Sequence, residues 1–207
     1  MGKVQPDVLL VHGLLNASWW LWPMARLLRQ QGFTPQLFGY SSIFENPNVA
    51  VAQLQQQLEK TPVRYVLGHS LGGLIALEAL RQKPTLPAER VVCLGSPLRG
   101  SRTAAALATH PVLKSALGCS AHLLKEGVAS WSGAASVGVV AGDLARGMGR
   151  VFADFSEASD GTVAVSETQL PGIADHCLVH ASHTGLVLSQ AAANQAAHFM
   201  RHGQFER

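Results

Sequence analysis

Residues 65–80 read YVLGHSLGGLIALEAL, and the fold is most directly predicted from this segment. An apolar run leads into Gly68-His69-Ser70-Leu71-Gly72-Gly73, and a helical pattern rich in leucine and alanine follows. The turn matches G-x-S-x-G, in which a strand reverses sharply into a helix with a serine at the apex. Side chains two positions on either side of the apex would collide, and Gly68 and Gly72 remove them. We therefore expect a strand over 63–67, a strained turn at Ser70 and a helix over 71–81.

The same alternation of apolar runs and helical spacing continues on both sides of this turn. Further strands are predicted over 8–11, 34–38, 90–94, 137–141 and 177–180, and further helices over 19–31, 49–58 and 184–202. This rhythm is typical of βαβ units, whose parallel strands form one sheet with helices on both faces. The predicted fold class is therefore α/β, with a mostly parallel central sheet and a small helical insert.

The composition is that of one folded domain spanning 1–207. Of the 207 residues 47% are hydrophobic and 14% are charged, which excludes a disordered, charge-extended chain. The net charge is only +3 and no run of Lys and Arg supports it, so we expect no nucleic-acid partner. The three cysteines are far apart, which fits neither a disulfide framework nor a zinc site, and no metal is expected.

The sequence carries no pattern typical of a membrane span or a secretion signal. No apolar stretch reaches the roughly 18 residues of a transmembrane helix. The first residues lead straight into an apolar strand, without the charged and apolar regions of a signal peptide. We therefore expect a cytoplasmic protein without an integral membrane span. The pattern leaves the oligomeric state open.

Ser70 is the candidate nucleophile, because the turn projects its hydroxyl clear of the sheet. The turn also leaves the Leu71 N–H at a helix N-terminus, where it can donate to an oxyanion. A second donor is expected from the loop that follows the first strand, within Leu10-Val11-His12-Gly13-Leu14-Leu15-Asn16. Gly13 permits a close backbone approach there, and the Leu14 N–H is the candidate donor. The alternative is an ordinary loop with a structural His12.

A nucleophilic serine needs a base, and the base needs an orienting acid. Asp160 is the favoured acid, because Ser159-Asp160-Gly161-Thr162-Val163 is a loop that can present a carboxylate from a strand end. Asp143 directly follows a predicted strand and is the main alternative. Asp154 has aromatic neighbours and could cap or pair locally, and Asp175 precedes the last strand at its wrong end.

His183 is the favoured base. It lies in Ala181-Ser182-His183-Thr184-Gly185, between the last predicted strand and the closing helix. This position is at the carboxyl edge of the sheet, where the Ser70 turn also lies. Of the other histidines, His180 falls within the strand, and His198 and His202 belong to the closing helix.

These motifs together resemble a small bacterial lipase or esterase of the α/β-hydrolase superfamily, over nearly the whole chain. The chain order Ser70, Asp160, His183 is the Ser…Asp…His order of that superfamily. Further segments that carry the resemblance are His12-Gly13, Gly95-Ser96-Pro97…Gly100-Ser101, Asp160-Gly161-Thr162-Val163 and Ser182-His183-Thr184-Gly185-Leu186. The loop after Gly13 lacks further glycines, so activity on esters of tertiary alcohols is not implied. The resemblance implies the α/β-hydrolase fold, with the roles already named for each residue.

The implied function is that of a serine hydrolase, which cleaves a small ester with an apolar acyl group through an acyl-enzyme and needs no cofactor. Acyl transfer, or hydrolysis of a thioester or amide, would use the same groups with another acceptor or leaving group. The non-enzymatic alternative is a hydrolase-fold protein that binds a hydrophobic ligand or partner.

Residues 97–135 interrupt the βαβ rhythm with helical fragments rich in Ala, Ser and Gly. This is the predicted helical insert, at a place where members of the superfamily often carry a cap. Its apolar side chains either line an acyl pocket or pack on the sheet; they are Leu107, Val112, Leu113, Leu117, Leu123 and Leu124. Trp19, Trp20 and Trp22 follow the Gly13 loop and are expected to wall the site or to pack in the core.

Overall fold

The computed structural model describes residues 5–110, 114–146 and 157–207. Its centre is a six-stranded sheet in the order β2-β1-β3-β4-β5-β6, in which every neighbouring pair is parallel. The strands are β1 (Val8–Val11), β2 (Pro35–Phe38), β3 (Tyr65–His69), β4 (Arg90–Leu94), β5 (Ser136–Gly142) and β6 (Asp175–Val179). The predicted α/β fold class is confirmed.

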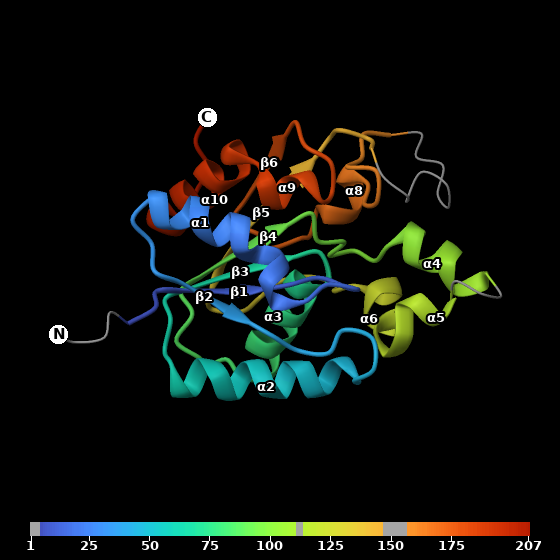
Figure 1. The fold of residues 1–207 in the computed structure, drawn as a ribbon, viewed down its shortest axis with the longest axis horizontal. Helices are drawn as coiled ribbons and strands as arrows, with labels where there is room; N and C mark the ends of the chain where they lie inside the picture. The colour runs from blue at the N-terminus through green and yellow to red at the C-terminus, as the bar shows by residue number, and fades with distance from the viewer. Residues whose placement is uncertain (1–4, 111–113, 147–156) are drawn as a thin grey trace.

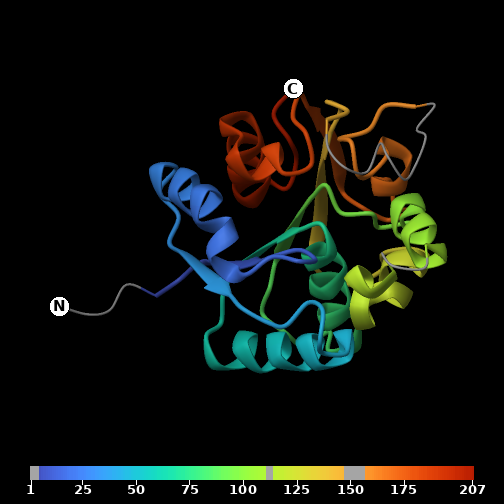
Figure 2. The same ribbon diagram turned by 45° about the vertical axis from the view of Figure 1, so that its right-hand side comes forward.

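Helices cover both faces of the sheet, as the βαβ rhythm predicts. Figure 1 and Figure 2 show α1, α9 and α10 on one side of the sheet and α2 and α3 on the other. The helices of these two layers are α1 (Trp22–Gln30), α9 (Gly185–Leu188), α10 (Gln190–His202), α2 (Pro47–Lys60) and α3 (Leu71–Gln82). Each layer packs on its own cluster of buried apolar side chains.

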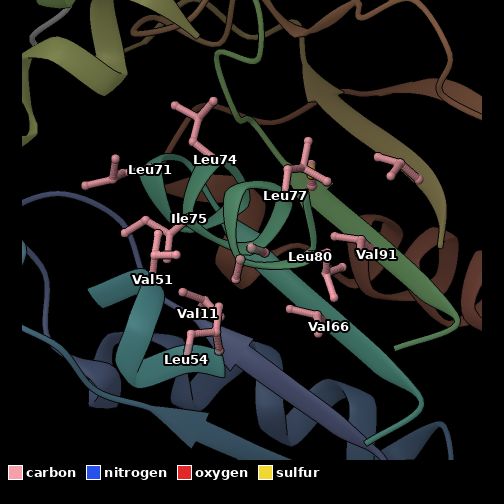
Figure 3. Close-up of a cluster of buried hydrophobic side chains, with 14 of the residues drawn as sticks. Val11, Val51, Leu54, Val66, Leu71, Leu74, Ile75, Leu77, Leu80 and Val91 are labelled. Atoms are coloured by element: carbon pink, nitrogen blue, oxygen red, sulfur yellow. The ribbon is translucent and has the colours of Figure 1, made fainter. Parts of the chain in front are cut away.

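Successive residues of a strand point to opposite faces, so each strand contributes to both clusters. Leu9 and Val11 of β1 belong to the cluster under α2 and α3, whereas Val8 and Leu10 belong to the cluster under α1 and α10. Figure 3 shows the first cluster, with apolar side chains of α2 and α3 gathered against those of the strands. This two-sided burial explains why the strands read as continuous apolar runs.

The helix and strand limits differ from those predicted in a few places, for local reasons. The helix expected over 19–31 is a short 3-10 helix, η1 (Ser18–Leu21), followed by α1, because Pro23 favours a helix start. The closing helix expected over 184–202 is interrupted at Ser189. That residue has extended backbone and its hydroxyl caps α10 by accepting the Ala192 N–H at 3.2 Å. The last strand runs over 175–179 rather than 177–180.

The predicted insert contains α4 (Arg102–Thr109), α5 (Lys114–Leu117), η2 (Gly118–Ser120) and α6 (Ala121–Glu126), beyond the carboxyl ends of the strands (Figure 1). Leu117 and Leu124 are buried in the cluster under α2 and α3, and Leu107 and Leu123 pack against it. These four side chains follow the packing alternative. Val112 and Leu113 lie outside the described residues.

A short helix, α8 (Val165–Thr168), comes between β5 and β6 in the sequence. In the described parts of the chain no helix combines the length and the apolar character needed to cross a membrane.

Candidate active site

Ser70 lies at the apex of the β3–α3 turn with a φ of 54° and a ψ of −122°, which is a strained conformation for a residue with a side chain. The turn is tight enough to require glycine on both sides. A Cβ at Gly72 would lie 2.2 Å from the carbonyl oxygen of Val11, and one at Gly68 would lie 2.4 Å from the Gly73 nitrogen. The Ser70 N–H donates to the Leu94 carbonyl at 2.9 Å, which fixes the apex above β4.

The loop that follows β1 lies against this turn; we call residues 12–16 the His12 loop. A Cβ at Gly13 would lie 3.0 Å from the Cβ of Ser70. Leu15 has a φ of 59°, and among the described residues only Leu15 and Ser70 have a positive φ without being glycine. Backbone strain of this kind concentrates at functional sites. Each strained residue is next in the chain to a candidate oxyanion donor: Leu15 follows Leu14, and Ser70 precedes Leu71.

His12 braces this loop from inside the protein. Its Nδ1–H donates to the Gly13 carbonyl at 2.9 Å, and the Tyr40 hydroxyl donates to the His12 carbonyl at 2.8 Å. The His12 and Tyr40 rings stack with centroids 4.3 Å apart. Burial lowers the pKa of His12, which favours the neutral imidazole. The side chain of His12 thus has the structural role considered from the sequence, while the backbone beside it approaches Ser70.

Asp160 and His183, the favoured acid and base, are brought together. His183 Nδ1 donates to Asp160 Oδ2 at 2.7 Å, and the His183 N–H donates to the Asp160 carbonyl at 2.9 Å. Asp160 is almost fully buried, and its Oδ1 accepts the N–H groups of Thr162 and Val163 at 2.9 and 2.7 Å. Both carboxylate oxygens are therefore engaged. With its proton held on Nδ1, His183 keeps Nε2 available as an acceptor.

The alternative acid, Asp143, forms a second Asp–His pair at the same edge of the sheet. Its Oδ1 accepts from His180 Nδ1 at 2.9 Å, just beyond the ends of β5 and β6. The His180 side chain is exposed and Asp143 is partly exposed, whereas Asp160 and His183 lie inside. An exposed pair of this kind contributes little to the stability of the fold and does little to hold the histidine in one orientation.

The remaining candidates lie elsewhere or outside the described residues. Asp175 begins β6 at the amino end of the strand, where it accepts the Phe205 N–H at 2.7 Å. His198 and His202 are on α10, with their rings 4.5 Å apart. Asp154 lies outside the described residues. No three His, Cys, Asp or Glu side chains gather as a metal site within the described ranges.

Sequence reasoning assigned no role to two residues that shape this site. His69 is fully buried and its Nε2 lies 3.0 Å from the His183 carbonyl oxygen. Gly95 has a φ of 55°, and a Cβ there would lie 3.0 Å from Asp160 Oδ2 and 3.2 Å from His183 Nδ1. The available signals were the histidine beside Ser70 and the glycine that directly follows β4.

Comparison with known proteins agrees with this architecture. Among solved structures, lipase BlEst2 of Bacillus licheniformis in its mature form has a TM-score of 0.77 and 19% identity, covering 97% of this chain and 92% of that one. Phospholipase PlaB from Legionella pneumophila has a TM-score of 0.69 and 16% identity, covering 95% and 57%. The lin2722 gene product of Listeria innocua has a TM-score of 0.61 and 14% identity, covering 98% and 99%. At these identities the likeness is one of fold.

No curated protein matches the chain significantly. The model of the alpha/beta hydrolase family, however, matches residues 8–202, which is nearly the whole sequence. The parallel sheet and the strand–turn–helix at Ser70 lie within that match. The chain therefore belongs to the alpha/beta hydrolase family.

Proposed function

We propose that this chain is a serine hydrolase of carboxylic esters, with Ser70 as nucleophile, His183 as general base and Asp160 as orienting acid. The observation that carries the proposal is the buried Asp160–His183 pair, with its 2.7 Å bond, which is also bonded to His69, the residue before the strained serine. A strained serine and a histidine oriented by a carboxylate are the parts that acyl transfer requires.

The proposed reaction has two steps. In the first, the Ser70 hydroxyl attacks the ester carbonyl carbon while its proton passes to Nε2 of His183. The tetrahedral intermediate then collapses, the bond to the leaving alcohol breaks, and His183 returns the proton to that alcohol. In the second step a water molecule gives its proton to His183, attacks the acyl carbon and releases the acid. Ser70 regains its proton, and the enzyme is restored.

The negative charge that develops on the carbonyl oxygen needs donors that are already in place. Leu71 is the first residue of α3, where the N–H has no partner within the helix. The Leu14 N–H belongs to the His12 loop, whose Gly13 lies against Ser70. Each such donor is worth about 3–4 kcal/mol of transition-state stabilisation in comparable sites. The bracing by His12 and Tyr40 keeps the loop in position before the substrate arrives.

The test is the loss of both turnover and labelling at Ser70. Ser70→Ala should abolish hydrolysis of p-nitrophenyl butyrate and labelling by a fluorophosphonate probe, with an unchanged circular dichroism spectrum. Ser130→Ala, at an exposed serine, is the matched control and should retain both. Full activity of Ser70→Ala would refute the assignment. Failure of the unaltered protein to label would instead favour a hydrolase-fold binding protein, and an ester product formed with added alcohol would indicate acyl transfer.

A further inference from the structure

A mostly apolar cavity of about 440 Å³ lies beside the His12 loop. One wall is formed by residues 15–17, 19 and 20, including Leu15, Trp19 and Trp20. The other is formed by residues 40–44 after β2, which we call the Tyr40 wall. The volume falls in the range of about 300 to 1,000 Å³ that is usual for small-molecule sites.

The apolar residues around this cavity are exposed without a structural reason. Leu15 is 58% exposed although its left-handed backbone costs free energy, and Trp19 and Phe44 are 68% and 85% exposed. Burial in the core does not offset the strain at Leu15. Apolar side chains that surround a hollow in this way mark a place where an apolar group binds.

The cavity adjoins the candidate active site through the His12 loop, whose residues Leu15 and Asn16 line it. Leu15 directly follows Leu14, the candidate oxyanion donor, and Gly13 of the same loop lies against Ser70. Tyr40 belongs to both places, because it lines the cavity and also stacks on His12. A substrate whose carbonyl oxygen reaches the Leu14 N–H therefore has the cavity at its side.

The order of the strands decides which half of an ester would enter. The Ser70 turn follows β3, His183 follows β6, and the cavity walls follow β1 and β2 on the other side of the turn. His183 must protonate the leaving oxygen, so the alcohol half has to lie on the β6 side. Resting on the proposed function, we propose that the β1–β2 cavity binds the apolar acyl chain of the ester, with Leu15 and Trp19 as specificity-determining residues.

The Tyr40 wall is held in place by the helical insert. The Ser120 hydroxyl donates to the Ser42 carbonyl at 2.9 Å, and the Cys119 N–H donates to the Ile43 carbonyl at 3.2 Å. A Cβ at Gly118 would lie 2.2 Å from the Ile43 carbonyl oxygen, so the two segments are in close backbone contact. The contacts with the insert thus fix this wall of the cavity before a ligand enters.

The experiment measures kcat/KM for p-nitrophenyl acetate, butyrate, hexanoate and octanoate. Each methylene that enters the cavity should raise kcat/KM by about fourfold until the cavity is filled. Leu15→Asn, which tolerates the left-handed backbone, and Trp19→Ala should each reduce the hexanoate-to-acetate ratio by about tenfold or more. Trp22→Ala removes an exposed indole that does not line the cavity, and it should leave the ratio unchanged.

A second series holds the acyl group as acetate and lengthens the alcohol. The gradient along this series should be the same in the unaltered protein, Leu15→Asn and Trp19→Ala. An acyl-chain gradient unchanged in both variants, or an alcohol gradient that responds instead, would overturn the cavity assignment. Either result, obtained with turnover that still depends on Ser70, leaves the proposed function standing. Turnover that persists in Ser70→Ala refutes the proposed function itself.

Discussion

The side chain of His69 donates a hydrogen bond to the backbone carbonyl of His183, with Nε2 and the oxygen 3.0 Å apart. A carbonyl oxygen only accepts, so the proton of His69 is on Nε2. The other ring nitrogen, Nδ1, is buried and has no hydrogen-bond partner among the residues that the structure describes, and the two imidazole rings lie 4.9 Å apart. The residue before the candidate nucleophile therefore holds the loop that carries the candidate base.

This bond makes His69 a positioning residue for the proposed reaction. His69→Leu removes the donor and should lower kcat by about 10- to 100-fold with a smaller change in KM, because a base displaced by a fraction of an ångström transfers the proton poorly. His69→Gln keeps an N–H donor on a side chain of similar reach and should recover a large part of kcat. Steady-state kinetics with p-nitrophenyl butyrate measure both effects.

Two further measurements separate positioning from general destabilisation of the fold. Thermal unfolding of both variants shows whether they differ in stability, and His180→Leu serves as the control at an exposed histidine. Equal activities of His69→Leu and His69→Gln at equal stability would contradict the positioning role.

The burial of His69 also predicts how stability depends on pH. Desolvation, with the neighbouring His183 as a smaller cause, lowers the pKa of His69 to about 3, whereas an unfolded histidine titrates near 6.5. Between these values the unfolded chain binds the extra proton, so the free energy of unfolding falls as the pH drops below about 6.5. The slope from this residue is up to about 1.4 kcal/mol per pH unit.

Urea unfolding at pH 7, 6 and 5 measures this dependence. Carboxylates and the buried His12 add to the slope of the unaltered protein, so the informative quantity is the difference from His69→Gln. As the pH falls, the free energy of unfolding of that variant should decrease less steeply, by up to about 1.4 kcal/mol per pH unit. Parallel pH dependences for the two proteins would show that His69 does not titrate on unfolding.

The features that sequence reasoning predicted are those encoded within a few consecutive residues. The apolar run 8–11 predicts a strand that is buried on both faces. The glycines at 68 and 72 predict a turn too crowded for side chains at those positions. The pairing of Asp160 with His183 was accessible because both fall in short loops between predicted elements at one sheet edge. Such signals do not depend on what packs against them.

The features that sequence reasoning missed depend on distant partners. The His69 side chain bonds to a residue 114 positions later, and the Tyr40 wall is held by η2 of the insert. The strain at Leu15 follows from the path of the His12 loop around Gly13, and nothing in its side chain indicates a positive φ. A histidine or a leucine in a turn has many structural uses, so its role appears only when the neighbours are known.

The two Asp–His pairs at the sheet edge allow the acid to be assigned by a matched experiment. Asp160→Asn keeps the shape of the side chain but removes the charge that orients His183, and kcat should fall by about 10⁴-fold. Asp143→Asn changes the exposed pair in the same way and should leave kcat within about twofold. Kinetics of the two variants on one ester compare them directly. A large loss in Asp143→Asn with little loss in Asp160→Asn would transfer the role to Asp143.

The loop that carries Asp160 is fastened to the insert through Glu167. This buried carboxylate accepts the backbone N–H of Arg102 at 2.8 Å, the Arg102 guanidinium at 3.1 Å and the Ala164 N–H at 2.9 Å. The Thr103 hydroxyl adds a bond to the Thr162 carbonyl at 2.6 Å. The start of α4 and the Asp160 loop thus form one connected unit.

Glu167→Ala should therefore reduce both stability and activity. It takes the acceptor from the buried Ala164 N–H and removes two bonds to Arg102, a loss of about 2–3 kcal/mol that corresponds to a decrease in Tm of roughly 5–10 °C. Because Asp160 loses its support, kcat should fall as well. Glu157→Ala removes the exposed carboxylate that also pairs with Arg102, and it should cost less than about 1 kcal/mol without affecting kcat. Calorimetry and ester kinetics on the two variants measure these effects. If Glu167→Ala has the same Tm and kcat as Glu157→Ala, the hydrogen bonds of Glu167 support neither the stability nor the activity.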